Sequence, residues 1–168
     1  MARQVKAYLA HPYSTMDWGF EFTKRLNAIG ITVIDPFDRP GQAELNKIET
    51  ANRTKNQVTG TIEFSIQQNK EIVEIDMIKV RQADIVIAVV DGTHGCPVCH
   101  VTDSKGTHME VMGAAFFMRM PVFTLYTQPG RIHPWYGYLS RGIAKTEEEL
   151  LTMLEAFLAQ PVAHDWYL

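Results

Sequence analysis

The chain has little cysteine: its 168 residues include only two, Cys96 and Cys99. Two cysteines so close together cannot build the disulfide framework on which small secreted domains depend. Long hydrophobic runs are also missing, since no apolar segment approaches the ~20 residues of a membrane-spanning helix. The N-terminus enters its first apolar segment without the core of a signal peptide. Together these absences predict a cytoplasmic protein with reduced thiols.

An excess of either charge is missing as well, because 16 basic and 19 acidic residues leave a net charge of -3. Nucleic acids and anionic membranes are bound by basic surfaces, and the sequence contains no basic cluster. Neither is therefore an expected partner. The length and the ordinary apolar content are typical of one globular domain with a sizeable core, spanning residues 1–168.

Short apolar segments rich in β-branched residues alternate with longer segments of helical periodicity. The short segments predict strands over residues 5–10, 31–34, 84–90, 121–126 and 142–144. Helical spacing predicts helices from Thr15 or Asp17 to Ile29, over 61–82, from Thr107 onwards, and from Thr146 to about Ala159. This alternation is typical of an α/β protein with a doubly wound, flavodoxin-like or Rossmann-like, five-stranded parallel sheet in the order 2-1-3-4-5.

The predicted helix over 61–82 has two kinds of residue on opposite sides. Its apolar positions can share one buried face: Ile62, Ile66, Val73, Met77 and Val80. Its charged positions are expected in solvent: Lys70, Glu71, Glu74 and Lys79. Asp76 has two interpretations, since it is either a solvated charge or part of a site.

The stretch from Ala83 to Phe117 carries the strongest functional signal. A strand ends at Asp91-Gly92, a polar loop follows, and Gly106-Thr107 leads into a helix that contains Glu110. In open α/β sheets, ligands bind beyond the carboxyl ends of the strands. The predicted strand order brings this region next to the loop after the first strand, which contains His11, Pro12, Tyr13, Ser14 and Thr15.

Glu110 has two interpretations. Thr107-x-x-Glu110 fits a capping box, in which the glutamate only returns to a backbone N–H of the first helical turn, and spacing alone favours this interpretation. As a site residue, Glu110 would instead be a nucleophile whose charged form the helix dipole favours. Carboxylates without a metal cage suit glycosidic chemistry, with hydroxyls from Tyr8 and Tyr13 opposite Asp91, Asp103 and Glu110.

Three segments resemble the nucleoside 2-deoxyribosyltransferase family. They are Val5-Lys-Ala-Tyr8-Leu-Ala10-His-Pro12-Tyr13, then Ala83-Asp84-Ile-Val-Ile-Ala88 with its end at Asp91-Gly92, and then Gly106-Thr107-x-x-Glu110-x-x-Gly113-x-Ala115. The segments follow the family's order and span most of the chain. The last one is moderately specific behind an Asp-Gly strand end, whereas each segment alone would be a weak signal.

The resemblance implies an enzyme that transfers the 2-deoxyribosyl group between nucleobases through a covalent deoxyribosyl-Glu intermediate, without a cofactor. By position, Glu110 would be the nucleophile, Tyr8 would orient it, and Asp76 would act near the base. The partners would be deoxynucleosides and free nucleobases, and the protein would be a homo-oligomer. The implied substrate-binding residues are Asp91, Gly92, Asp103, Gly106, Thr107, His11, Pro12 and Tyr13.

The chain departs from the family pattern in three places. Asp103 lies seven residues before Glu110, where family members keep an aspartate six residues before, and residues 93–105 resemble an inserted loop, so that Asp91 is an alternative for this role. Family members also extend an asparagine into a neighbouring subunit's site, and Tyr136-Gly-Tyr-Leu-Ser140 contains none. The aromatic tail of some members is matched only by Trp166-Tyr167.

Two other functions remain open. A hydrolase that cleaves the base from nucleosides or their 5'-monophosphates would have the same fold, and such relatives carry Ser and Arg in the first loop. This loop has Ser14 and Thr15 but no arginine, although Lys105 or Arg131 could supply charge from another loop. The second alternative is a non-catalytic nucleotide-binding module.

Cys96-Pro-Val-Cys99-His100 has the ligand types and part of the spacing of a zinc site. A second ligand pair is missing, and we therefore expect no metal. The alternative is a small structural zinc knuckle that orders the loop beside Glu110.

Overall fold

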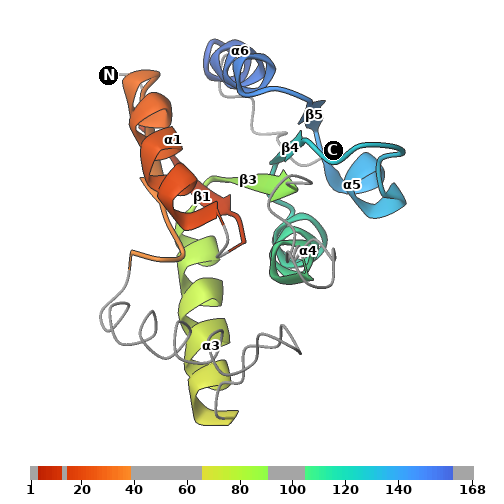
Figure 1. Cartoon of the computed structure of the whole chain (residues 1–168). Coiled ribbons are helices and arrows are strands. Elements are labelled where there is room, and N and C mark those ends of the chain that lie inside the picture. Colours follow the sequence, from red (N-terminus) through yellow and green to blue (C-terminus); the bar gives the residue numbers. More distant parts are fainter. Residues whose placement is uncertain (1–3, 13–14, 39–65, 91–104, 161–168) are drawn as a thin grey trace.

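The core of the computed structural model, which describes residues 4–12, 15–38, 66–90 and 105–160, is one parallel sheet of five strands. The sheet order is β2-β1-β3-β4-β5, and all neighbouring strands are parallel. Strands β1, β3, β4 and β5 follow one another in this order in Figure 1. The predicted fold class and strand order are thus confirmed. The strands are β1 (Val5–Ala10), β2 (Ile31–Ile34), β3 (Ile85–Val90), β4 (Val122–Tyr126) and β5 (Gly142–Ala144).

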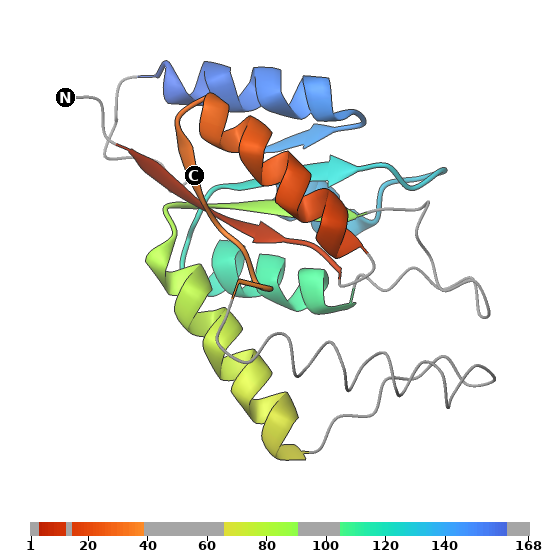
Figure 2. The same cartoon turned by 60° about the vertical axis from the view of Figure 1, so that its left-hand side comes forward.

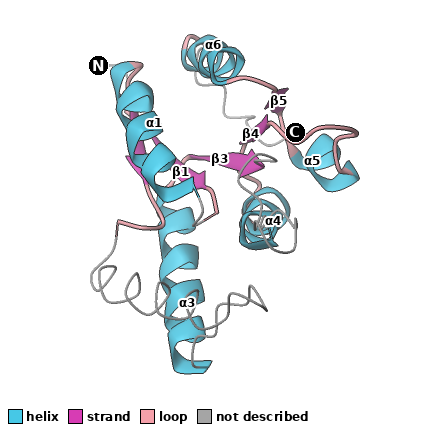
Figure 3. Ribbon diagram, viewed as in Figure 1, coloured by secondary structure: helices cyan, strands magenta, loops and turns pink. Residues whose placement is uncertain are grey.

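Helices cover both faces of the sheet, as Figure 2 shows. One face is covered by α1 (Met16–Ala28) and α6 (Glu147–Leu158), and the other by α3 (Ile66–Gln82), α4 (Lys105–Met112) and α5 (Pro134–Leu139). In the secondary-structure colouring of Figure 3, the strands form a single layer between these helices. Of the helices in the described ranges, none has both the length and the apolar character to cross a lipid bilayer.

The side-chain alternation of the strands divides the core in two. In β1, Ala7 and Leu9 pack with Phe22 of α1, whereas Tyr8 and Ala10 lie in the cluster that α3 and α4 cover. All six residues of β3 are buried, as expected for a central strand of a parallel sheet. Tyr8 therefore points toward the face from which α3 and α4 can supply polar side chains.

The exposed residues of α3 correct one prediction. Ile66 and Val73, expected on the buried face, are 78% and 60% exposed, whereas Val80 is fully buried. The helix is longer than the sheet beneath it, and its N-terminal half projects past the sheet edge in Figure 2. Only its last turns can therefore bury apolar side chains. Ile62 and the predicted start of this helix lie outside the described residues.

Two short helical elements differ from the predictions. Residues 134–139, for which no helix was predicted, form α5, with His133 at the N-cap and Pro134 in the first turn, where proline is tolerated. The predicted helix from Thr107 continues beyond α4 as a π-helix, η2 (Gly113–Phe117), in which Met118 N–H donates to the Gly113 carbonyl at 3.2 Å. Such π-turns frequently occur at functional sites.

The start of α6 provides a test of these local assignments. The Thr146 hydroxyl accepts a hydrogen bond from Glu149 N–H at 3.2 Å. We expect Thr146→Ala to lower the free energy of unfolding by about 1 kcal/mol in chemical denaturation, because one N–H of the first turn loses its partner. Thr152→Ala on the exposed side of the same helix is the matched control. It should leave stability unchanged or raise it by up to about 0.5 kcal/mol, since alanine is the better helix former. Equal losses in the two variants would contradict the cap.

Candidate active site

The candidate site lies at the carboxyl ends of β1 and β3, which are neighbours in the sheet. The chain leaves β1 for α1 on one face of the sheet and leaves β3 for α4 on the other. This divergence is the topological switch point, the place at which open α/β sheets bind ligands. The site's side chains come from β1, α3 and α4.

A hydrogen bond joins the two residues that were predicted to work together. The Tyr8 hydroxyl donates to Oε1 of Glu110 at 2.9 Å, across 102 residues of sequence. Tyr8 is fully buried and Glu110 is half-buried. A rigid strand therefore holds one oxygen of a carboxylate that reaches it from a helix.

The surroundings of Tyr8 are strongly acidic. Burial raises the pKa of the Tyr8 hydroxyl well above its usual value of 10.0, and the negative charges of Glu110 and Asp76 raise it further. The hydrogen bond to Glu110 and the charge of Asp35 act in the same direction. The Tyr8 hydroxyl thus keeps its proton at neutral pH and is a donor to the carboxylate.

The capping-box interpretation of Glu110 is wrong. Lys105 and Gly106 are already helical, so Thr107 lies inside α4 and is not its N-cap, and Glu110 lies beyond the first turn. The Glu110 carboxylate accepts a hydrogen bond from Tyr8. At this position the helix dipole does not favour the charged form of Glu110 in the way expected for a residue of the first turn. Thr107 is buried, and its hydroxyl has no hydrogen-bond partner within the part of the chain that the structure describes.

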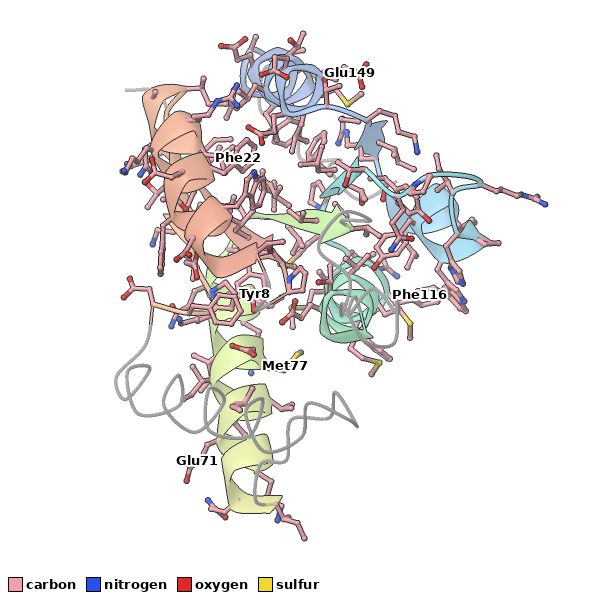
Figure 4. All side chains as sticks on the ribbon, viewed as in Figure 1. Tyr8, Phe22, Glu71, Met77, Phe116 and Glu149 are labelled. Atoms are coloured by element: carbon pink, nitrogen blue, oxygen red, sulfur yellow. The ribbon has the colours of Figure 1, made fainter. Side chains whose placement is uncertain are left out.

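Asp76 is part of the same surroundings. It is half-buried on α3, and one of its carboxylate oxygens is shielded from solvent. Its charge contributes to the raised pKa of Tyr8. The side chain of Met77, the next residue on α3 (Figure 4), reaches η2, because a Cβ added to Gly113 would lie 3.6 Å from its terminal methyl group. Asp76 is therefore a half-buried charge that acts on Tyr8, and not a fully solvated surface charge.

Several predicted site residues lie outside the described residues: Tyr13, Asp91, Gly92, Asp103, Cys96, Cys99 and His100. Gly106 is in the first turn of α4, and the Pro12 carbonyl accepts from the backbone N–H of Thr15 at 3.0 Å. Among the side chains of residues 4–12, 15–38, 66–90 and 105–160, no three His, Cys, Asp or Glu come together as a metal site.

Two residues near the site were not among the site residues predicted from the sequence. Asp35, at the end of β2, is buried; its Oδ1 accepts from the Phe37 backbone N–H at 2.7 Å, and its Oδ2 lies 3.3 Å from His11 Nε2. Lys79, predicted to be in solvent, is half-buried and donates to the carbonyls of Asp35 at 2.6 Å and Asp38 at 2.5 Å. Only the Asp-Pro turn after a strand marked this region, and turns of that kind are common.

Comparisons with known proteins identify the family and the fold of this chain. The family model described as nucleoside 2-deoxyribosyltransferase matches residues 7–153. In structure, the chain is similar to a 2-deoxyribosyltransferase from Bacillus psychrosaccharolyticus, with a TM-score of 0.61 and 18% identity over 91% of this chain and 95% of that one. At that identity the similarity shows the fold alone. No curated protein sequence matches. Because the family model spans most of its length, the chain belongs to the nucleoside 2-deoxyribosyltransferase family.

Proposed function

We propose that this protein transfers a 2-deoxyribosyl group from one nucleobase to another through a covalent bond to Glu110. The observation that carries the proposal is the 2.9 Å hydrogen bond that fixes the Glu110 carboxylate against Tyr8 at the ligand-binding edge of the sheet. An oriented carboxylate is what covalent glycosyl transfer requires. Membership of the nucleoside 2-deoxyribosyltransferase family supports the same activity.

The proposed reaction has two displacement steps. In the first, a carboxylate oxygen of Glu110 attacks C1' of the sugar while the C1'–N bond breaks, and the bonding electrons leave with the base. Asp76 is the proposed donor of the proton that the departing base takes up, because its carboxyl group lies in the shielded surroundings of Tyr8, and this donation leaves it as a carboxylate. In the second step, a nitrogen of the incoming base attacks C1', the proton of that nitrogen passes to the Asp76 carboxylate, and the Glu110 carboxylate is released. Two inversions give net retention.

Tyr8 has an orienting role in this proposal. Its hydroxyl holds Oε1, and so limits the rotation of the Glu110 side chain before attack. The acidic surroundings also favour the positive charge that develops on the sugar ring in the transition state.

The sugar and base would be bound by the loops around this centre. The Thr107 hydroxyl is a candidate for a substrate hydrogen bond, because a buried hydroxyl without a partner is costly and a bound ligand would supply one. The other proposed substrate-binding residues come from the loop after β1, from the segment that follows β3 and from the start of α4: Pro12, Tyr13, Asp91, Gly92, Asp103 and Gly106. The side chain of His11, which the resemblance also implied for substrate binding, has no exposed surface and cannot contact the substrate directly.

Glu110→Gln tests the nucleophile. The amide oxygen can still accept from Tyr8, but it cannot form the ester with C1', and base exchange should fall by at least about a thousandfold while the fold is retained. The measurement is chromatography of a deoxynucleoside incubated with a different free base, together with thermal unfolding.

Glu155→Gln, at an exposed position of α6 on the opposite face of the sheet, is the matched control and should exchange bases like the wild type. Exchange retained in Glu110→Gln would remove the proposed mechanism. If the wild type releases free sugar at one rate with or without an acceptor base, the protein is a hydrolase instead.

Tyr8→Phe tests the orienting hydrogen bond. Removing a hydrogen bond to a charged group costs about 1.5–3 kcal/mol, which corresponds to roughly a tenfold to hundredfold loss in kcat if the bond is needed in the transition state. The KM for the deoxynucleoside should change little. Steady-state kinetics of base exchange would show this, and an unchanged kcat would exclude the orienting role.

The raised pKa of Tyr8 also predicts how stability depends on pH. Its contribution to stability is fully present below the unfolded-state pKa of 10.0, and is lost as the pH rises from there toward the folded-state pKa. Above pH 10 the free energy of unfolding should therefore fall more steeply in the wild type than in Tyr8→Phe, by up to about 1.4 kcal/mol per pH unit. Urea denaturation from about pH 9 to about pH 11 measures both slopes. Equal slopes would contradict the prediction.

A further inference from the structure

A buried histidine connects the loops that follow β1 and β2. The side chain of His11 has no exposed surface, its Nδ1 lies 3.0 Å from the Thr15 hydroxyl, and its Nε2 lies 3.3 Å from Oδ2 of Asp35. Asp35 is itself held, because its Oδ1 accepts from the Phe37 backbone N–H at 2.7 Å. The ring therefore joins two loops at the carboxyl edge of the sheet, where the candidate site lies.

The Thr15, His11 and Asp35 side chains resemble a hydroxyl-imidazole-carboxylate triad in order, but the hydroxyl is not available as a nucleophile. The Thr15 hydroxyl donates its single proton to the Pro12 carbonyl at 2.8 Å, so it accepts from His11 Nδ1. Thr15 is also buried. The arrangement is thus suited to holding a loop and not to attacking a substrate.

Thr15 binds His11 instead of capping α1. It occupies the N-cap position of α1, yet its side chain makes no capping hydrogen bond. A threonine cap normally contributes about 1 kcal/mol to helix stability. The hydroxyl is directed to His11 and Pro12 instead, which indicates that the geometry of this loop has been favoured over the stability of the helix start.

The ring of His11 is enclosed on both sides. A Cβ on Gly19 of α1 would lie 2.4 Å from Cε1 and 2.5 Å from Nε2 of His11, so only glycine leaves room for the ring. On another side, the Phe37 ring meets the imidazole edge-on with centroids 5.0 Å apart. His11 can therefore occupy one position only, and it fixes residues 35–38, the Asp35 loop, relative to α1.

The network continues to the elements that carry the proposed catalytic residues. Lys79 donates to the Asp35 carbonyl at 2.6 Å, and it lies one helical turn after Asp76 on α3. His11 itself follows the strand that carries Tyr8. The pairs His11–Asp35 and Lys79–Asp35 thus link β1, the loop after β2 and α3.

We propose that His11 is a positioning residue for deoxynucleoside binding, which acts by holding the Asp35 loop against the loop after β1. The inference rests on the proposed function. His11 lies on the α1 side of the sheet and Tyr8 on the α4 side, so the imidazole acts through the loops and not on the reacting atoms. Disturbing the ring should raise KM and leave kcat nearly unchanged.

The test uses Gly19→Ala, His11→Ala and the double variant in the full chain. Each single variant should raise the KM for the deoxynucleoside about tenfold, the equivalent of one hydrogen bond, with kcat within about threefold of the wild type. Adding Gly19→Ala to His11→Ala should cause no further rise, because the methyl group then enters the space left by the ring. His11→Gln, which can still reach Asp35, should recover part of the affinity.

Gly137→Ala is the matched control, since Gly137 is also helical but has nothing within 4 Å of an added Cβ. It should keep the wild-type KM. Variants that lose thermal stability but keep the wild-type KM, or a double variant with the two effects multiplied, would overturn the proposal.

A wild type without base exchange would overturn the proposed function only. The positioning role is then measured by calorimetric titration of a 2'-deoxynucleoside into the same variants. Equal affinity in all of them, or no binding by the wild type, would overturn the positioning role as well.

Discussion

The contact between the Tyr8 hydroxyl and the Glu110 carboxylate is the constraint around which the site is built. A half-buried carboxylate is unfavourable unless donors replace its lost water, and Tyr8 supplies such a donor from a fully buried position in the sheet. The contact requires β1 and β3 to be adjacent and α4 to return over the face to which Tyr8 points. This hydrogen bond therefore depends on the strand order and on the layer arrangement, and the proposed chemistry depends on this hydrogen bond.

The electrostatics of the site follow from the same arrangement. Three carboxylates from different elements, Asp35, Asp76 and Glu110, all raise the pKa of one phenol. The negative charges at this edge of the sheet disfavour the binding of anionic groups and stabilise positive charge on a sugar ring. This is the charge distribution expected of an enzyme that passes through an oxocarbenium-like transition state. It also keeps the phenol protonated, so that the orienting group remains a donor.

Much of the fold could be predicted from the sequence because local patterns determine it. The apolar, β-branched segments at 5–10, 31–34 and 84–90 specify strands, and alternation with helices leaves few topologies. Tyr8 and Glu110 were found through segments that resemble a known family, and the structure then brought the two together. The family itself is confirmed by the match over residues 7–153.

The predictions that were wrong concern residues whose surroundings are set by contacts between distant parts of the chain. Thr107-x-x-Glu110 is compatible with both a cap and a site, and only the position of Thr107 inside α4 decides between them. Ile66 and Val73 have helical periodicity, but α3 extends past the sheet that would bury them. Asp35 and Lys79 are ordinary in sequence, and the Asp35 network becomes visible only when β1, β2 and α3 are assembled.

The central claim is that Glu110 forms a bond to the sugar, and mass spectrometry of the protein tests it most directly. The wild type is mixed with a deoxynucleoside without an acceptor base, quenched in acid and digested. We predict a peptide containing Glu110 that carries the added mass of one deoxyribosyl group and loses it when a free base is supplied. An adduct on another residue, or turnover with no adduct on Glu110 at any time, would contradict the account.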